Sequence, residues 1–230
     1  MPSIIALIPA RAGSKRIPGK ATKILGGKPL IRWTVEAAEA SGIFSAIVVC
    51  ADTREIIHAS GAANAWLRPD IPDHQPDIEW VRAVMGEDYR ASHDAFSILR
   101  PTSPFRTGQT IQRAWEQFQK GDCHSLRAVQ PVREHPGKMW VMGAKNRVMT
   151  PFQPQPAEGT PTHSRATQSL PPVYVQNASL EIAWTYVIKA FDTISGTKVM
   201  PFFTSPVEGF DINTQADWEE AERIMAAIQR

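Results

Sequence analysis

Cysteine is scarce in this sequence of 230 residues, which contains only Cys50 and Cys123. Two distant cysteines support neither a disulfide framework nor a four-ligand zinc site, so we expect both to be buried thiols. Long apolar runs are also missing, since none approaches the roughly 20 residues that cross a bilayer. The short run 4–9 lacks the basic flank of a signal peptide. We therefore expect a cytoplasmic protein with no membrane partner.

A strong net charge is absent as well. The chain has 25 basic and 23 acidic residues, which gives a net charge of +2. This balance lacks the extended positive field that attracts nucleic acid, so any phosphate site must be built locally. The hydrophobic content of 43% is that of an ordinary globular protein, and the length fits one principal domain over residues 1–230.

Apolar runs and helical periodicity alternate in the first fifty residues. Segments 4–8 and 46–51 are β-branched and apolar throughout, which is typical of parallel strands covered on both faces. Between them, segment 29–40 has the apolar spacing of an amphipathic helix. This order predicts a βαβ unit with parallel strands. We also expect strands at 95–99, 173–175 and 180–184, and helices at 110–119 and 217–228, the last capped by Thr214 or Asn213.

The segment 130–172 differs from the rest because prolines interrupt it repeatedly and it is rich in Gln and Thr. It lacks the apolar periodicity to fold alone. We interpret it as an insertion or arm that is either mobile or ordered against something else, for which a second subunit is a natural candidate.

The loop after the first predicted strand concentrates small and cationic residues. Open parallel sheets bind ligands at the carboxyl ends of their strands. Small residues let backbone N–H groups approach a phosphate, and cations neutralise it, so this loop predicts a phosphate site. A solvated basic turn would explain the charges but not their alternation with small residues. The small residues are Ala10, Ala12, Gly13 and Ser14, and the cations are Arg11, Lys15, Arg16 and Lys20.

Two common phosphate motifs do not fit this loop. Five residues separate Gly13 from Gly19, and Ala21 follows Lys20, whereas the P-loop of NTPases needs four residues between its glycines and Ser or Thr after the Lys. The dinucleotide fingerprint GxGxxG is missing too.

Four segments, in order along the whole chain, resemble the acylneuraminate cytidylyltransferases. Segment 8–20 is similar to their phosphate loop, 99–106 to LQPTSPLR, 173–180 to the YxxNG strand and 209–214 to DID(T/N). A related branch that activates 3-deoxy-manno-octulosonate has RxxSTRLPGK at the loop, which fits less well. The resemblance implies a nucleotidyltransferase domain with a mostly parallel, three-layer α/β Rossmann-like sheet of the nucleotide-diphospho-sugar transferase type. The segment 130–172 would be its small dimerisation arm.

The resemblance further implies that CMP passes from CTP to the anomeric hydroxyl of a nonulosonic, sialic-type acid, with release of pyrophosphate, in a homodimer. Arg11, Lys15 and Asp211 would be catalytic, and Asp211 with Asn213 would bind Mg²⁺ or Mn²⁺. The implied nucleotide contacts are Ala10, Arg11, Ala12, Gly13, Ser14, Lys15, Lys20 and Arg68, and the implied sugar contacts are Arg100, Thr102, Ser103, Arg165, Gln168, Tyr174 and Asn177.

Several interpretations stay open. Asp211 is also suited to capping the closing helix, and Arg68 to a structural role in a loop. Ala21, Arg100 and Ala178 replace the Asn, Gln and Gly of the family pattern, and Asn213 replaces a metal-binding Asp. These departures leave room for another nucleotide such as GTP, for another acid such as octulosonate or a phosphonate, or for a catalytically silent nucleotide-binding protein.

Overall fold

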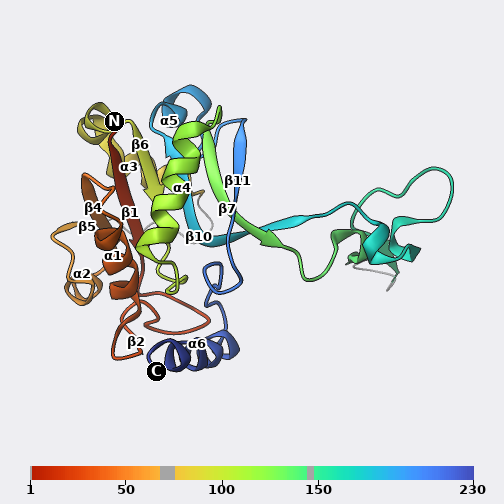
Figure 1. Cartoon of the computed structure of the whole chain (residues 1–230), viewed down its shortest axis with the longest axis horizontal. Helices are drawn as coiled ribbons and strands as arrows, with labels where there is room; N and C mark the ends of the chain where they lie inside the picture. Colours follow the sequence, from red (N-terminus) through yellow and green to blue (C-terminus); the bar gives the residue numbers. More distant parts are fainter. Residues whose placement is uncertain (1, 68–75, 144–147) are drawn as a thin grey trace. The chain divides into compact units, whose positions relative to one another are not determined.

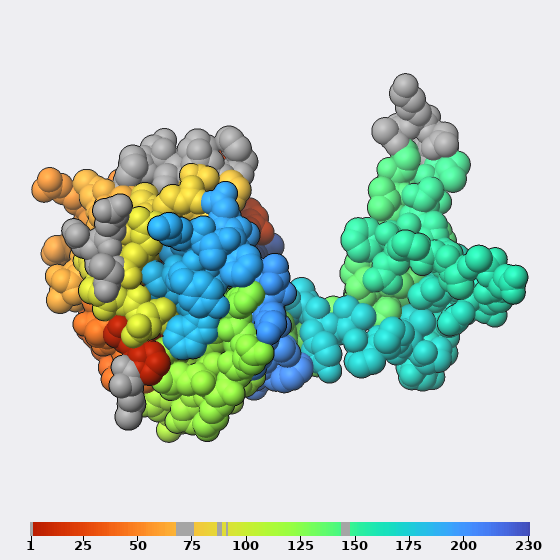
Figure 2. Space-filling model, turned by 90° about the horizontal axis from the view of Figure 1, so that it is seen from above, coloured from red at the N-terminus to blue at the C-terminus, as the bar shows by residue number. Residues whose placement is uncertain are grey.

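The computed structural model describes residues 2–67, 76–143 and 148–230 (Figure 1). The chain forms two compact units, of which the first comprises Met1–Ala128 with Asn177–Arg230 and the second comprises Val129–Gln176. The Pro-rich segment 130–172 falls within the second unit, the green-to-cyan body in Figure 2. No helix in the described ranges combines the length and apolarity that a membrane span requires.

A seven-stranded, mostly parallel sheet forms the centre of the first unit. Its strand order is β11-β7-β10-β6-β1-β4-β5. β1 pairs in parallel with β4 and β6, β4 pairs in parallel with β5, and β10 runs antiparallel to β6. The strands are β1 (Ile4–Ala10), β4 (Ala46–Ala51), β5 (Asn64–Leu67), β6 (Ala95–Ile98), β7 (Ser125–Pro131), β10 (Tyr174–Trp184) and β11 (Val199–Phe203).

Helices cover both faces of this sheet. Successive side chains of β1 point to opposite sides, so β1 contributes to a buried cluster on each face. Ile4, Ala6 and Ile8 join a buried cluster with α1 and α4, whereas Ile5 and Leu7 join a second cluster with α3. The predicted three-layer α/β architecture is therefore confirmed. The helices are α1 (Leu30–Ser41), α2 (Arg54–Ser60), α3 (Asp77–Ser92), α4 (Gly108–Lys120), α5 (Tyr186–Phe191) and α6 (Gln215–Ile228).

The predicted elements are present, with some boundaries corrected. β4 has the predicted bounds, and β1 continues past the predicted end to include Pro9. Pro9 is tolerated because it lies beyond the last β6 pair, Leu7 with Ile98, where β1 is paired on one side only. The two strands predicted at 173–175 and 180–184 form one strand, β10. Asn177 is buried within it, and its amide donates to Thr204 Oγ1 just after β11.

The closing helix α6 begins with a capping box. Thr214 Oγ1 accepts the Asp217 N–H at 3.2 Å, and Asp217 Oδ2 accepts the Thr214 N–H at 2.7 Å. The N-cap is thus Thr214, and the alternatives Asn213 and Asp211 are not needed for that role. Trp218 and Met225 of α6 pack on Leu25 in the hairpin of β2 (Ile24–Leu25) and β3 (Lys28–Pro29), which directly follows the cationic loop.

The second unit has almost no apolar core. Among its described residues only His135 and Gly137 are buried. The Gly137 N–H donates to His135 Nδ1 at 2.9 Å, and Lys138 Nζ donates to the His163 carbonyl at 2.9 Å. Backbone and polar contacts therefore hold this unit together. Its regular elements are the hairpin of β8 (Trp140–Met142) and β9 (Met149–Pro151) and three short 3₁₀ turns, Pro136–Lys138, Thr162–Ser164 and Thr167–Ser169.

A buried cation links the loop after β6 to the layers around it. The Arg106 side chain is 2% exposed and, within the described residues, forms no ion pair with a carboxylate. It donates instead to the Ser179 carbonyl of β10 and to Thr34 Oγ1 of α1, the latter at 2.9 Å. Burial lowers the pKa of Arg106 to about 9, so the guanidinium is still protonated at neutral pH.

Replacing Thr34 with valine should therefore destabilise the fold by about 1–3 kcal/mol, because a buried guanidinium N–H loses its acceptor. Urea unfolding followed by circular dichroism measures this change. Thr34→Ser keeps the hydroxyl and should lose only about 1 kcal/mol, for one buried methyl group. Equal losses in the two variants would contradict the assigned role of the hydroxyl.

Candidate active site

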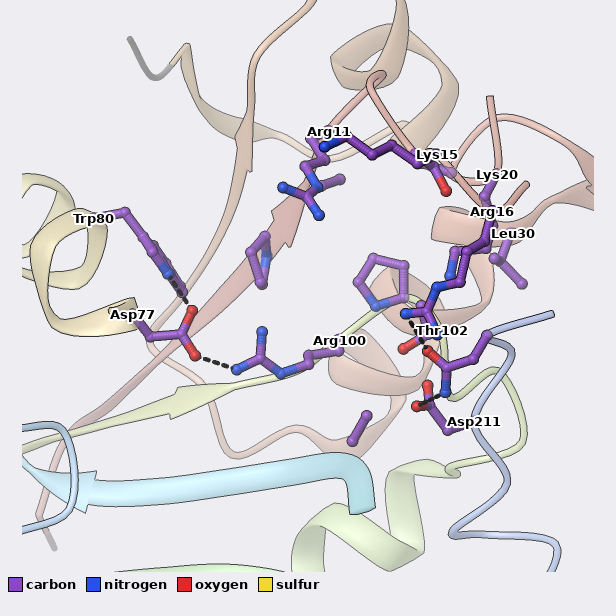
Figure 3. Close-up of a pocket in the computed structure, with 17 residues that line it drawn as sticks. Arg11, Lys15, Arg16, Lys20, Leu30, Asp77, Trp80, Arg100, Thr102 and Asp211 are labelled. Carbon is purple, nitrogen blue, oxygen red and sulfur yellow. Dashed lines mark hydrogen bonds and ion pairs between the residues drawn. The ribbon is translucent and has the colours of Figure 1, made fainter. Parts of the chain in front are cut away.

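A cavity of about 590 Å³ lies at the carboxyl ends of β1 and β6, entirely within the first unit. Its volume is in the range of small-molecule sites. Figure 3 shows its walls, to which β1 and the following loop, the start of α3, the segment after β6 and residues near 211 all contribute. The predicted site residues that line it are Ala10, Arg11, Ser14, Lys15, Lys20, Arg100, Thr102, Asp211 and Asn213.

The cationic loop after β1 is anchored at its first turn. Both carboxylate oxygens of Asp52, the residue after β4, accept the Ala12 N–H, at 2.9 and 3.1 Å. A turn then follows in which the Ser14 N–H donates to the Ala12 carbonyl at 2.8 Å. Ala12 and Gly13 do not line the cavity themselves. They belong to the backbone that carries Arg11, Ser14 and Lys15 to its wall.

The far end of the loop is tied to the segment before α6. Lys20 Nζ donates to the Ile212 carbonyl at 2.6 Å, and Arg16 Nη2 donates to Asn213 Oδ1 at 3.0 Å. Burial is the main reason why the pKa of Lys20 is lowered, with Asp211 opposing the shift and Arg16 adding to it. Two segments nearly 200 positions apart in the chain thus form one wall of the cavity.

Asp211 is the carboxylate of this wall. Its Oδ2 accepts from Asn213 Nδ2, whereas its Oδ1 is buried and has no hydrogen-bond partner within the described part of the chain. An unsatisfied buried carboxylate oxygen is costly unless a ligand or ion completes it. Asp211 Oδ1 is therefore the atom of this wall best suited to a cation. No group of three or more His, Cys, Asp or Glu side chains suited to a metal occurs in the described ranges.

The opposite wall holds an ion-pair network centred on Arg100. Arg100 Nη2 contacts Glu181 Oε1 at 3.1 Å and also pairs with Asp77. Glu181 in turn pairs with Arg127, and Trp80 Nε1 donates to Asp77 Oδ1 at 2.8 Å. Burial acts to lower the pKa of Arg100, but Glu181 and Asp77 outweigh it and raise the pKa above its ordinary value.

The other predicted contacts lie elsewhere. Ser103 is fully buried and does not line the cavity, and Asn177 uses its amide to contact Thr204. Arg68 is outside the described residues. The predicted sugar contacts Arg165, Gln168 and Tyr174 are exposed residues of the second unit.

Three carboxylates that shape the site were not predicted as site residues: Asp52, Asp77 and Glu181. Asp52 and Asp77 have sequence signals, since Asp52 directly follows the strand 46–51 and Asp77 precedes the helically spaced apolar residues 80, 81, 84 and 85. Glu181 has none, because an acidic residue within an apolar strand gives no indication of its partner.

These features define an α/β fold with a cation-lined cavity at the strand ends. Comparisons with known proteins specify the fold further. Residues 5–136 match the family described as Cytidylyltransferase. CMP-N,N'-diacetyllegionaminic acid synthase of Legionella pneumophila is 32% identical over 98% of this chain and 97% of its own length. The chain therefore belongs to the cytidylyltransferase family, and it is a nucleotidyltransferase.

One further relative supports the family, and one solved structure supports the fold. N-acylneuraminate cytidylyltransferase of Streptococcus agalactiae serotype III is 32% identical over 61% of this chain and 35% of its own length. The solved structure of CMP:2-keto-3-deoxy-manno-octonic acid synthetase complexed with CTP shares the fold, with a TM-score of 0.69, 16% identity and coverage of 98% of this chain and 99% of that one.

The Asp52 anchor gives a prediction for the loop. Asp52→Ala and Asp52→Asn both remove the negative charge, but only the asparagine keeps an oxygen that accepts the Ala12 N–H. We expect the alanine variant to bind inorganic pyrophosphate about tenfold more weakly than the asparagine variant, the equivalent of one hydrogen bond of about 1.4 kcal/mol. Titration calorimetry measures both affinities, and equal values would show that the anchor does not order the loop.

Proposed function

We propose that this enzyme transfers CMP from CTP to the anomeric hydroxyl of a nonulosonic acid, such as a legionaminic or sialic acid, and releases pyrophosphate. The observation that carries the proposal is the joining of the cationic loop to Asp211 around one cavity. The relative that aligns over nearly its whole length is named for a CMP-activated acid of this type. The octulosonate cytidylyltransferases align with no more than 50% of this chain, so we place their acceptor second.

Phosphate chemistry explains the arrangement of cations. When a sugar hydroxyl attacks the α-phosphorus of CTP, negative charge grows on the bridging oxygen and leaves with pyrophosphate. Fixed cations around a small cavity stabilise this charge without having to reorganise. Arg11, Lys15 and Lys20 are the groups that we assign to the triphosphate, and Ser14 lies among them on the same wall.

The residues around Asp211 fit a magnesium or manganese ion. Mg²⁺ takes oxygen ligands, keeps several waters, and needs only one or two protein carboxylates when phosphates complete its shell. We propose that Asp211, through the otherwise unsatisfied Oδ1, holds this ion. Asn213 is a weaker candidate because its amide already bridges Asp211 and Arg16. The ion would supply further neutralisation of the phosphate charge.

We also propose that the enzyme is a cytoplasmic homodimer. Its two cysteines are free and buried, as expected in a reducing compartment. The second unit has almost no apolar core, yet it exposes several large apolar side chains. Exposed apolar patches of this kind mark interaction surfaces. The exposed side chains on and beside the β8–β9 hairpin are Trp140 (40%), Val141 (50%), Met142 (62%), Met149 (50%) and Phe152 (60%).

Charge placed on this hairpin should dissociate the dimer. Light scattering after gel filtration should give the wild type twice the chain mass of 25.5 kDa and Met142→Lys a mass near that of one chain, because a buried lysine opposes association. Glu158→Lys, at an exposed polar position of the same unit, should remain dimeric. A monomeric wild type, or a dimeric Met142→Lys, would refute this assembly.

The proposed reaction is tested by pyrophosphate release with Mg²⁺, using CTP, UTP, GTP and ATP against N-acetylneuraminate, legionaminate, octulosonate and a phosphonate. Release with CTP and a nonulosonate is the expected outcome. Release only with another nucleotide or another acid would show that the enzyme uses that pair of substrates instead. Nucleotide binding without turnover of any pair would favour a silent binding protein.

Lys15 provides a test of the phosphate loop. We expect Lys15→Ala to lower turnover about 100-fold or more, since a donor aimed at developing charge is removed. An exposed lysine contributes little to folding, so the melting temperature should change by less than about 2 °C. Lys120→Ala, at the exposed end of α4, is the matched control and should keep full activity. Parallel loss of activity and melting temperature in Lys15→Ala would remove its catalytic role.

A further inference from the structure

The wall of the cavity opposite the lysines carries a hydrogen-bond acceptor and a donor side by side. Figure 3 shows Asp77, Trp80 and Arg100 at the end remote from Lys15, Lys20 and Asp211. Asp77 Oδ1 accepts the Trp80 indole N–H at 2.8 Å, and Asp77 Oδ2 pairs with Arg100 Nη2. The carboxylate and the guanidinium are thus held next to each other, and each retains capacity for a ligand.

This acceptor and donor pair is rigidly supported. Trp80 is 3% exposed and packs in the core between α3 and the sheet. Glu181, also nearly buried, contacts the same Arg100 Nη2 and is itself paired with Arg127. A polar group locked by a second layer of contacts keeps its geometry when a ligand arrives, which is the condition for selective recognition.

The charge of the network also bears on what it can bind. Asp77 and Glu181 together balance Arg100 and Arg127. The pKa of Asp77 is lowered, because Arg100 and Trp80 outweigh the opposing effect of burial. Asp77 is therefore ionised at neutral pH. A wall with an ionised carboxylate and a compensated cation attracts an acidic sugar weakly, and it suits a neutral group with a donor beside an acceptor.

We propose that Asp77 and Arg100 select the nucleobase, with Asp77 accepting from the 4-amino group of cytosine and Arg100 donating to its ring nitrogen N3. This inference rests on the proposed function, in which the lysines of the opposite wall hold the triphosphate. Cytosine presents a donor beside an acceptor, whereas uracil presents the reverse, a carbonyl at C4 and N3–H. A site built to pair with one pattern rejects the other, because its own buried polar groups are then left unpaired.

The selectivity is tested by the ratio of CTP to UTP affinity, measured by titration calorimetry on the full-length protein without an acceptor sugar. In Asp77→Asn the oxygen that accepts from Trp80 is retained, while an amide N–H is created that can donate to the uracil carbonyl. We expect the preference for CTP over UTP to fall at least tenfold in this variant.

Glu79→Gln is the matched control, because Glu79 is an exposed carboxylate of the same helix α3 that does not line the cavity, and its removal leaves Asp77 in place. Its CTP to UTP ratio should stay within twofold of the wild type. An unchanged ratio in Asp77→Asn, or an equal fall in Glu79→Gln, would overturn the proposal. Comparable turnover ratios for different acceptor acids in wild type and Asp77→Asn would support it, whereas a change in those ratios alone would assign Asp77 to the sugar.

A second measurement does not depend on the variant folding. The triphosphate of 2-pyrimidinone riboside lacks the 4-amino group, so the wild type should bind it at least tenfold more weakly than CTP. Equal binding would overturn the role of Asp77. Failure of the wild type to bind any nucleotide would instead contradict the proposed function, so the two failures are distinguishable.

Discussion

The structure depends on holding several like charges together at the carboxyl end of β1. Arg11, Lys15, Arg16 and Lys20 lie within ten positions of one loop, and their mutual repulsion must be offset before any substrate arrives. Protein acceptors do this at both ends of the loop: Asp52 holds its first turn, and the segment ahead of α6 receives Lys20 and Arg16. The same contacts that stabilise the loop therefore shape one wall of the cavity, for which we propose phosphate binding.

This constraint also explains the placement of α6. Its capping box fixes the turn that carries the backbone and side-chain acceptors of the loop, and Trp218 anchors the helix on the hairpin after the loop. Thr214 and Asp217 together cap the helix, which leaves Asp211 for the cavity. The helix thus fixes the position of the preceding segment, whose Asp211 and Asn213 line the cavity. The opposite wall has its own neutral network and is independent of these contacts.

Much of the architecture was predictable because its signals are local. The apolar runs that form β1 and β4 and the helical period of α1 arise from neighbouring residues, and the cationic loop is contiguous. The Arg100 network was not predictable, since its partners Asp77 and Glu181 come from distant elements. From the sequence, Arg100 was an implied sugar contact, and nothing in its sequence spacing indicated that Asp77 and Glu181 pair with it. The placement of the implied sugar contacts Arg165, Gln168 and Tyr174 in the second unit likewise follows from packing, which their spacing in the sequence does not reveal.

The most direct test of the account is the fate of the oxygen that attacks. The acid sugar is labelled with ¹⁸O at its anomeric hydroxyl, and the phosphorus resonances of the products are measured after turnover with CTP. The account predicts that the CMP phosphorus of the product shows the ¹⁸O isotope shift and that pyrophosphate carries no label. Label attached to pyrophosphate, or an unlabelled CMP phosphorus in the sugar product, would contradict attack of this hydroxyl on the α-phosphorus.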